Sequence, residues 1–220
     1  MRGVAHELRT PLTYLSTNLD LVERAVERVL ADLPPDRADA ARARLAPRLM
    51  DAREGMDRIN RLVEDLRKFT KLRETGEVMA LDLAPIVDEA LGLYRATRRG
   101  DVTVVDELRP TPVRLLDRVQ VQQVVLNLLE NAREARPRDA VVTVRTFADE
   151  AGRPVLEVED NGPGIPPDVQ ARMWDPFFTT KPDGSGLGLS IVKRIADGHG
   201  ATVACRSAPG AGTVFRLTFR

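Results

Sequence analysis

Apolar residues recur at alternating steps of three and four along the first 33 residues, with polar residues between them. The members of this first series are Ala5, Leu8, Leu12, Leu15, Leu19, Val22, Val26, Val29 and Leu33. This spacing is typical of a coiled-coil seam and predicts a long amphipathic helix, which Pro34-Pro35-Asp36 is expected to end. A second series predicts a second helix and comprises Leu45, Leu49, Ala52, Met56, Ile59, Val63 and Leu66. Together the two series predict an antiparallel helical hairpin.

Each arm of this hairpin carries one continuous apolar stripe. A single hairpin cannot bury both stripes well, whereas two hairpins can bury all of them in a symmetric four-helix bundle. The sequence therefore predicts a homodimer that forms through the hairpin.

Glycine usage marks a boundary near residue 75. Gly3 and Gly55 are the only glycines before Gly76, whereas nine of the fifteen glycines fall between Gly162 and Gly212. We expect the hairpin domain over residues 1–74, a short linker over residues 75–80 and a second domain over residues 81–220.

The second part of the chain mixes the periods of strands and helices. Segments rich in branched apolar residues predict strands over Val78–Leu83, Val102–Leu108, Val113–Leu116, Ala140–Phe147, Pro154–Glu159, Thr202–Arg206 and Thr213–Phe219. Helices are predicted over Pro85–Arg98, Arg118–Ala135, Pro167–Trp174 and Gly188–Gly198. The fold class is therefore α+β, and the second domain is expected to be a two-layer α/β sandwich with one mixed sheet, helical on one face.

Composition excludes several classes of protein. The 33 basic residues balance 33 acidic ones, which is unlike the basic surface of a nucleic-acid-binding protein. A single cysteine, Cys205, excludes a disulfide framework and a cysteine-based metal cluster. No apolar stretch approaches the roughly 20 residues that a transmembrane helix needs. We therefore expect no nucleic-acid partner and no membrane segment in this chain.

The segment Asp160-Asn161-Gly162-Pro163-Gly164 follows directly on a predicted strand. Asp160 could accept a hydrogen bond from an exocyclic amine, while Gly162 and Gly164 let the backbone approach a flat base. Taken alone, the segment is equally consistent with an ordinary turn.

A glycine-rich loop, Gly184-Ser185-Gly186-Leu187-Gly188, runs into an apolar helix whose first amides and dipole suit phosphate oxygens. It does not match the P-loop pattern and lacks a preceding strand. We interpret this loop as a flexible segment that closes over phosphate groups. Lys181, just before it, could reach a terminal phosphate as a point charge, although an exposed lysine is usually only solvated.

Asn127 and Asn131 are four residues apart and therefore share one face of the predicted helix. Amide oxygens beside a nucleotide can complete the shell of a Mg²⁺ ion already held by phosphates. The other motifs in this part of the chain strengthen the hypothesis that this asparagine pair has a functional role.

His6 lies one residue past a seam position, so it is expected to point to solvent. The neighbouring Glu7 could orient one ring nitrogen and receive its proton while the other nitrogen attacks. A lone surface histidine is more often inert. Pro11 lies inside the same predicted helix, where a proline costs roughly 3 kcal/mol and needs a compensating reason. A local kink near His6 would provide that reason.

These motifs resemble the transmitter core of a bacterial sensor histidine kinase. In that family's order, the matching segments are His6–Leu12 for the H box, Asn127–Ala132 for the N box, Asp160–Gly164 for the G1 box, Asp175–Lys181 for the F box and Gly184–Leu189 for the G2 box. The resemblance implies a phosphoacceptor and dimerisation hairpin, followed by an ATP-binding domain of the superfamily shared with gyrase B and MutL. The segments Phe-Phe-Thr-Thr-Lys and Asn-Ala-Arg-Glu-Ala are similar to the branch that contains nitrogen-regulation and dicarboxylate sensors.

The same resemblance assigns roles in the hairpin. It implies that His6 is the phosphoacceptor, that Glu7 is its acid or base, and that Thr10 helps to orient water in a reverse phosphatase reaction. The expected partner is the receiver domain of a response regulator. Relatives extend this helix towards a sensor or a membrane segment, so we expect a cytoplasmic domain of a longer protein that is anchored by an absent N-terminal part.

In the second domain the resemblance implies bound ATP and Mg²⁺. Asp160 would read adenine, Asn131 with Asn127 would hold the ion, and Lys181 would steady the γ-phosphate. The nucleotide-binding glycines and their neighbour would be Gly162, Gly164, Gly184, Gly186, Leu187 and Gly188. Glu134 stands where many relatives carry a basic residue, so phosphate contacts from this helix should be weaker and Lys181 more important.

Two other functions are weighed against the kinase. An ATP-hydrolysing clamp of the same superfamily uses a glutamate four residues before the metal-binding asparagine, but that position here is Asn127, which cannot take a proton. A catalytically silent dimeric scaffold would bind ATP or a receiver domain without turnover, but no motif residue expected for ATP binding is missing from this sequence. Glu130 keeps the ATPase alternative open.

Overall fold

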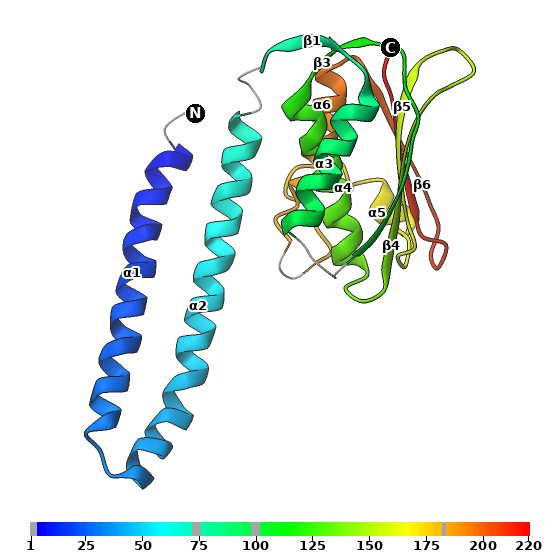
Figure 1. Ribbon diagram of the computed structural model, residues 1–220. Helices are drawn as coiled ribbons and strands as arrows, with labels where there is room; N and C mark the ends of the chain where they lie inside the picture. The colour runs from blue at the N-terminus through cyan, green and yellow to red at the C-terminus, as the bar shows by residue number, and fades with distance from the viewer. Residues whose placement is uncertain (1–3, 72–75, 98–101, 182–183) are drawn as a thin grey trace. The chain divides into compact units, whose positions relative to one another are not determined.

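The computed structural model describes residues 4–71, 76–97, 102–181 and 184–220, and the side chains of residues 4–10, 61 and 64–71 lie outside this description. Contacts divide the chain into two units, Met1–Lys71 and Leu72–Arg220, and each is described by itself (Figure 1).

The first unit is a helical hairpin of α1 (Val4–Ala31) and α2 (Pro35–Lys71). Its arms are antiparallel, because Arg53 of α2 pairs with Glu23 while Arg42 pairs with Glu27. The second helix begins at Pro35, well before the apolar series that predicted it, since proline is tolerated in the first turn. The hairpin prediction is confirmed.

Much of the apolar surface of the hairpin is exposed. Leu12 and Leu30 are buried, whereas large apolar side chains along both helices face solvent. These include Tyr14, Leu15, Leu21, Val22, Val29, Leu45, Met50 and Ile59. An apolar groove also runs between the arms, lined by residues such as Val22, Val26 and Leu45. The described hairpin therefore leaves its seam partly uncovered.

The described residues of the second unit form two sheets. Its strands are β1 (Val78–Leu81), β2 (Val102–Leu108), β3 (Arg114–Asp117), β4 (Ala140–Ala148), β5 (Pro154–Asp160), β6 (Thr202–Ser207) and β7 (Thr213–Thr218). The main sheet has the order β2-β4-β5-β7-β6, with β2 parallel to β4 and the other neighbours antiparallel. We predicted one sheet, but β1 and β3 form a separate antiparallel pair. Residues 78–80, which we assigned to a linker, lie in this small sheet.

Helices cover one face of the main sheet (Figure 1). They are α3 (Leu83–Thr97), α4 (Arg118–Ala135) and α6 (Gly188–Gly198), and α5 (Pro167–Gln170) is a single turn. The core between the layers is apolar and includes Leu129 of α4, Val144 of β4 and Leu217 of β7. The two-layer arrangement with a mixed sheet is confirmed.

The other face of the main sheet carries charged side chains. Arg145 of β4 donates to Glu107 of β2 at 2.8 Å and to Glu159 of β5 at 2.5 Å. These pairs run across neighbouring strands of the sheet. A face of this kind suits water rather than a second apolar layer.

Two helix boundaries differ from the predictions. Helix α3 begins at Leu83 rather than Pro85, because Asp82 accepts a hydrogen bond from the Ala84 N–H at 3.0 Å and so caps an earlier turn. The helix predicted over Pro167–Trp174 ends at Gln170. Beyond it the Arg172 N–H donates to Val169 O and the Asp175 N–H to Arg172 O, which are turns rather than α-helix.

Asp117 joins three segments at the start of α4. Its side chain accepts from the Gln120 N–H at 3.1 Å, as a helix cap does, and from the Gly76 N–H at 2.7 Å. Its own N–H donates to His199 Nε2 at 3.0 Å, and it is 2% exposed. The chain that enters the second unit, α4 and the end of α6 are thereby tied together.

Asp117→Ala should therefore destabilise the second unit by about 2–3 kcal/mol, because it removes a helix cap and a further charge-assisted hydrogen bond. Asp117→Asn keeps one acceptor for the cap and should cost less than half as much. Urea unfolding followed by the fluorescence of Trp174, the single tryptophan of the chain, measures both. Equal losses for the two variants would contradict this role of the carboxylate.

Candidate functional site

The residues predicted to bind a nucleotide converge along one side of α4. Asn127 Nδ2 donates to Gly188 O at 3.3 Å, which ties α4 to the start of α6. A Cβ atom added at Gly188 would lie 3.8 Å from Asn131 Oδ1, and one at Gly162 would lie 3.5 Å from Ala135 Cβ. The segments after β5 and before α6 thus both approach α4.

Asp160 ends β5 and is partly buried. Burial raises the pKa of its carboxyl group, and backbone hydrogen bonds from Gly162 and Thr213 oppose that shift in part. The Gly162 N–H donates to Asp160 Oδ1 at 2.8 Å, so the carboxylate is held in one orientation. A partly dehydrated and oriented carboxylate is a strong acceptor for a ligand N–H group.

Two residues near Asp160 escaped the sequence analysis. Thr213 is 4% exposed, and its backbone donates to Asp160. Gly212 has φ +73°, and a Cβ atom there would lie 2.1 Å from Asp160 O. The signal that could have found them is the glycine-rich turn before the last strand, Pro209-Gly210-Ala211-Gly212.

Cys205 lies on β6, within electrostatic reach of Asp160. Burial raises the pKa of its thiol to about 11, and the charge of Asp160 adds to the shift. The thiol is therefore protonated at neutral pH and is a poor nucleophile. We assign it no chemical role.

Gly164 holds the turn after β5 against the turn before β7. It has φ +75°, and a Cβ atom there would lie 2.0 Å from Ala208 O. Near it the Gly210 N–H donates to Pro163 O at 2.7 Å. This close approach of two backbones explains the need for glycine.

The glycine loop before α6 is pinned to the segment that precedes it. Gly186 has φ +67°, a Cβ atom there would lie 2.4 Å from the carbonyl carbon of Phe177, and the Phe177 N–H donates to Gly186 O at 2.9 Å. Leu187 is 1% exposed and stands at the N-cap of α6, where it offers no side-chain cap. The first turn of α6 therefore lacks the internal acceptor that a serine or aspartate would supply.

The two asparagines differ in their surroundings. Asn127 is engaged on both sides, since its Oδ1 accepts from Gln123 Nε2 at 2.8 Å while its Nδ2 contacts Gly188. Asn131 Nδ2 is buried and has no hydrogen-bond partner among the described residues. A buried donor without a partner is costly, so Asn131 fits a site that a polar ligand completes.

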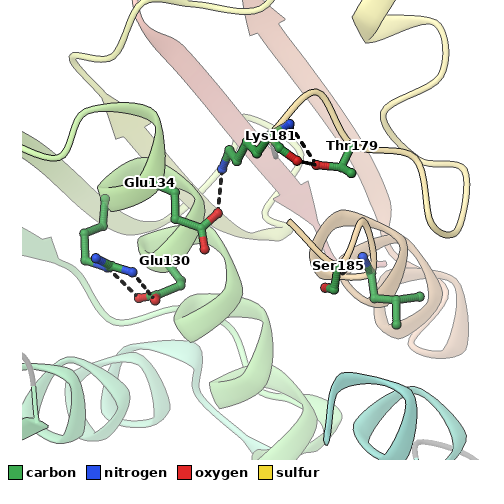
Figure 2. A network of polar contacts seen from close by, with 7 residues as sticks. Glu130, Glu134, Thr179, Lys181 and Ser185 are labelled. Atoms are coloured by element: carbon green, nitrogen blue, oxygen red, sulfur yellow. Dashed lines mark hydrogen bonds and ion pairs between the residues drawn. The ribbon is translucent and has the colours of Figure 1, made fainter. Parts of the chain in front are cut away.

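Lys181 is paired with a side chain of α4 rather than pointing freely into solvent. Its Nζ lies 2.7 Å from Glu134 Oε2, and Figure 2 shows the lysine reaching across to the helix. Gly184, the first glycine of the loop, contacts this segment, because its N–H donates to Lys181 O at 3.3 Å. The sequence had placed Lys181 on a phosphate and had not predicted this ion pair.

His6, Glu7 and Thr10 lie on the described backbone of α1, but their side chains are outside the described residues. The exposure predicted for His6 therefore stays a prediction. Within the residues that the structure describes, no helix is long and apolar enough to cross a membrane.

Two family models match the chain. A family model described as "His Kinase A (phospho-acceptor) domain" matches residues 1–75, and one described as "Histidine kinase-, DNA gyrase B-, and HSP90-like ATPase" matches residues 116–220. The chain belongs to the sensor histidine kinase family. The resemblance identified from the five sequence motifs is thereby confirmed.

Relatives of this chain include the two kinds of sensor that the motifs indicated. The chain is 32% identical over 224 residues to the C4-dicarboxylate transport sensor protein DctB of Rhizobium meliloti, covering 99% of this chain and 34% of DctB. It is 29% identical over 228 residues to the sensory histidine kinase/phosphatase NtrB of Rhodobacter capsulatus, covering 98% of this chain and 59% of NtrB. The chain thus spans about a third to three fifths of these relatives.

A solved structure, full-length ShkA in complex with AMPPNP, is 27% identical with a TM-score of 0.68. The match covers 99% of this chain and 44% of the ShkA chain. Both units of the fold therefore have counterparts in that structure.

Proposed function

We propose that this chain transfers the γ-phosphoryl group of ATP to His6 and then passes it to an aspartate of a response regulator. The observation that carries the proposal is the arrangement around α4, where the start of α6 approaches Asn127 and Asn131 and the buried Asn131 Nδ2 has no partner among the described residues. The phosphoacceptor family model, which matches residues 1–75, supplies the acceptor part of the proposal. Phosphoryl transfer depends mainly on positioning and charge stabilisation.

Asp160 would bind the exocyclic amine of adenine, with Gly162 and Gly164 allowing the base to approach the backbone. The first amides of α6, together with Gly184, Gly186, Leu187 and Gly188, would face the phosphates. The match of residues 116–220 to the histidine kinase-, DNA gyrase B- and HSP90-like ATPase family supports these assignments.

The residues that would hold Mg²⁺ are the two asparagines of α4, whose amide oxygens are of the ligand type that this ion takes. Among the described residues no group of three or more His, Cys, Asp or Glu side chains could hold a metal. Asn131, helped by Asn127, would hold the ion through an amide oxygen, and phosphates and water would supply its other ligands. When bound, Mg²⁺ would neutralise part of the phosphate charge.

His6 would act as the nucleophile. One ring nitrogen bonds to the γ-phosphorus as the bond from that phosphorus to the β,γ-bridging oxygen breaks and ADP leaves. Glu7 then takes the proton from the other ring nitrogen. The second histidine of the chain, His199, is a poor candidate, because its Nε2 accepts from the Asp117 N–H and its Nδ1 lies 2.8 Å from Ile195 O.

Two partners are expected, a second copy of this chain and a receiver domain. The exposed apolar seam of the hairpin supports a homodimer through a four-helix bundle. A receiver domain would take the phosphoryl group from His6, breaking the nitrogen–phosphorus bond and forming an oxygen–phosphorus bond on its aspartate. Because ATP and such receivers occur in the cytoplasm, we place this chain there.

A reverse phosphatase activity is a second candidate, favoured by the relative NtrB, whose name includes that activity. Thr10, one turn after His6, would orient the attacking water.

Incubation with ATP labelled at the γ-phosphate tests the proposal against its alternatives. The kinase predicts label on the chain that acid removes and base does not. Release of free phosphate without labelled protein would indicate an ATPase, and neither product would indicate a silent scaffold. Either of these two outcomes would contradict the proposal.

Nucleotide affinity should fall as the pH is lowered from neutrality, and should begin to fall at a higher pH than an ordinary aspartate would cause. The reason is that Asp160 must be ionised to accept the adenine amine, while burial raises its pKa and so protonates it earlier. The same shift acts oppositely on folding, since the folded state binds the proton more tightly and loses this stabilisation as the pH rises through the raised pKa. Titration of ADP at a series of pH values measures the effect, and Asp160→Asn should remove this pH dependence.

A further inference from the structure

Lys181 is positioned by contacts at its backbone and at its charged end. The Lys181 N–H donates to Thr179 Oγ1 at 3.1 Å, and the ammonium lies 2.7 Å from Glu134 Oε2 (Figure 2). The two charged side chains are 35% and 38% exposed. The ion pair therefore stands in partial contact with water and can exchange partners at small cost.

Glu134 shares a face of α4 with the two asparagines of the site. Positions 127, 131 and 134 follow the spacing of four and three that stacks side chains on one side of a helix. Glu134 lies one turn beyond Asn131, about 4.5 Å along the helix axis. The ion pair therefore adjoins the place proposed for the phosphates.

We propose that Glu134 is a specificity-determining residue that occupies Lys181 until the terminal phosphate of a nucleoside triphosphate displaces it. The inference rests on the proposed nucleotide site. Carboxylate and phosphate oxygens are both anionic acceptors, and a lysine ammonium can pair with either one as a compact point charge. ATP exchanges one ion pair for another, whereas ADP has no γ-phosphate and leaves Lys181 on Glu134.

This exchange predicts that Glu134 affects the binding of the triphosphate and not the binding of the diphosphate. Breaking the pair with Glu134 opposes binding of the triphosphate and does not oppose binding of the diphosphate. An exposed ion pair of this kind shifts an equilibrium by up to about fivefold. Glu134 therefore lowers the affinity for the triphosphate selectively.

Calorimetric titration of Mg-AMPPNP and Mg-ADP tests the inference in the full chain, in Glu134→Gln, in Lys181→Gln and in the double variant. Glutamine keeps the side-chain size of Glu134 and removes its charge. Glu134→Gln should tighten AMPPNP binding by about twofold to fivefold and leave ADP binding unchanged. In the Lys181→Gln background this gain should shrink, because the lysine for which the two anions compete is gone.

Asp197→Asn is the matched control, because it removes the carboxylate of another lysine pair, in which Lys193 Nζ lies 2.6 Å from Asp197 Oδ1. It should change neither affinity. The inference is overturned by three results in Glu134→Gln: no change in AMPPNP affinity, equal tightening of AMPPNP and ADP, or a gain that is as large without Lys181. The last would show simple charge repulsion. If the wild-type chain binds neither nucleotide, the proposed nucleotide site is wrong. If the wild-type chain binds both nucleotides and Glu134→Gln changes neither affinity, the site stands and only the role proposed for Glu134 is wrong.

Discussion

Asp160→Asn is expected to weaken the binding of ADP and AMPPNP by about 1.5–3 kcal/mol, or roughly tenfold to more than a hundredfold. The substitution removes the negative charge that would accept the adenine amine and places an amide there instead. Asparagine keeps an oxygen for the Gly162 N–H, which donates to Asp160 Oδ1 at 2.8 Å. It also removes a partly buried charge whose burial raises the carboxyl pKa. Affinity should therefore fall while the second unit stays folded.

Calorimetry measures the affinity, and the fluorescence of Trp174 during urea unfolding reports the stability. Glu159→Gln is the control, because it removes the charge of the preceding residue, which pairs with Arg145 at 2.5 Å rather than facing the site. The control should bind nucleotide as the wild type does. If Asp160→Asn bound ADP with unchanged affinity, adenine would have to be recognised elsewhere.

Gly164→Ala is expected to destabilise the second unit by about 3–5 kcal/mol, since two penalties combine. A side chain at φ +75° is strained by itself, and the added Cβ atom would lie 2.0 Å from Ala208 O. The obstacle is backbone, so no side-chain rotation relieves it. The turn after β5 would have to move, and Asp160 with it.

Gly152→Ala separates the two penalties. Gly152 has φ +70°, and a Cβ atom there would meet nothing within 4 Å. It should cost only the conformational part, about 1–2 kcal/mol. Unfolding in urea compares the two variants. Equal losses would mean that the contact with Ala208 is relieved at no cost.

The regular elements of this chain were largely predictable because their signals are local. The periods of apolar residues gave α4 and α6 with the bounds that the structure has, Arg118–Ala135 and Gly188–Gly198. The candidate residues on these helices follow from spacing, which places Asn127 and Asn131 on one face wherever a helix forms.

What escaped prediction depends on contacts between distant segments. The pairing of β1 with β3, apart from the main sheet, joins residues about 35 positions apart, and their apolar pattern does not encode the partner. The bond from Asp117 N–H to His199 and the pair of Lys181 with Glu134 likewise join residues 82 and 47 positions apart. A charged residue in a sequence identifies its chemistry but not its neighbour.

The measurement that tests the assignment of His6 as phosphoacceptor most directly is the location of the phosphoryl group after incubation with Mg-ATP. The chain contains two histidines, so digestion and mass spectrometry under conditions that preserve phosphohistidine assign the label to one of two peptides. We expect phosphate on the peptide that carries His6 and no labelled protein for His6→Gln. Phosphate on His199, or undiminished labelling of His6→Gln, would contradict this assignment.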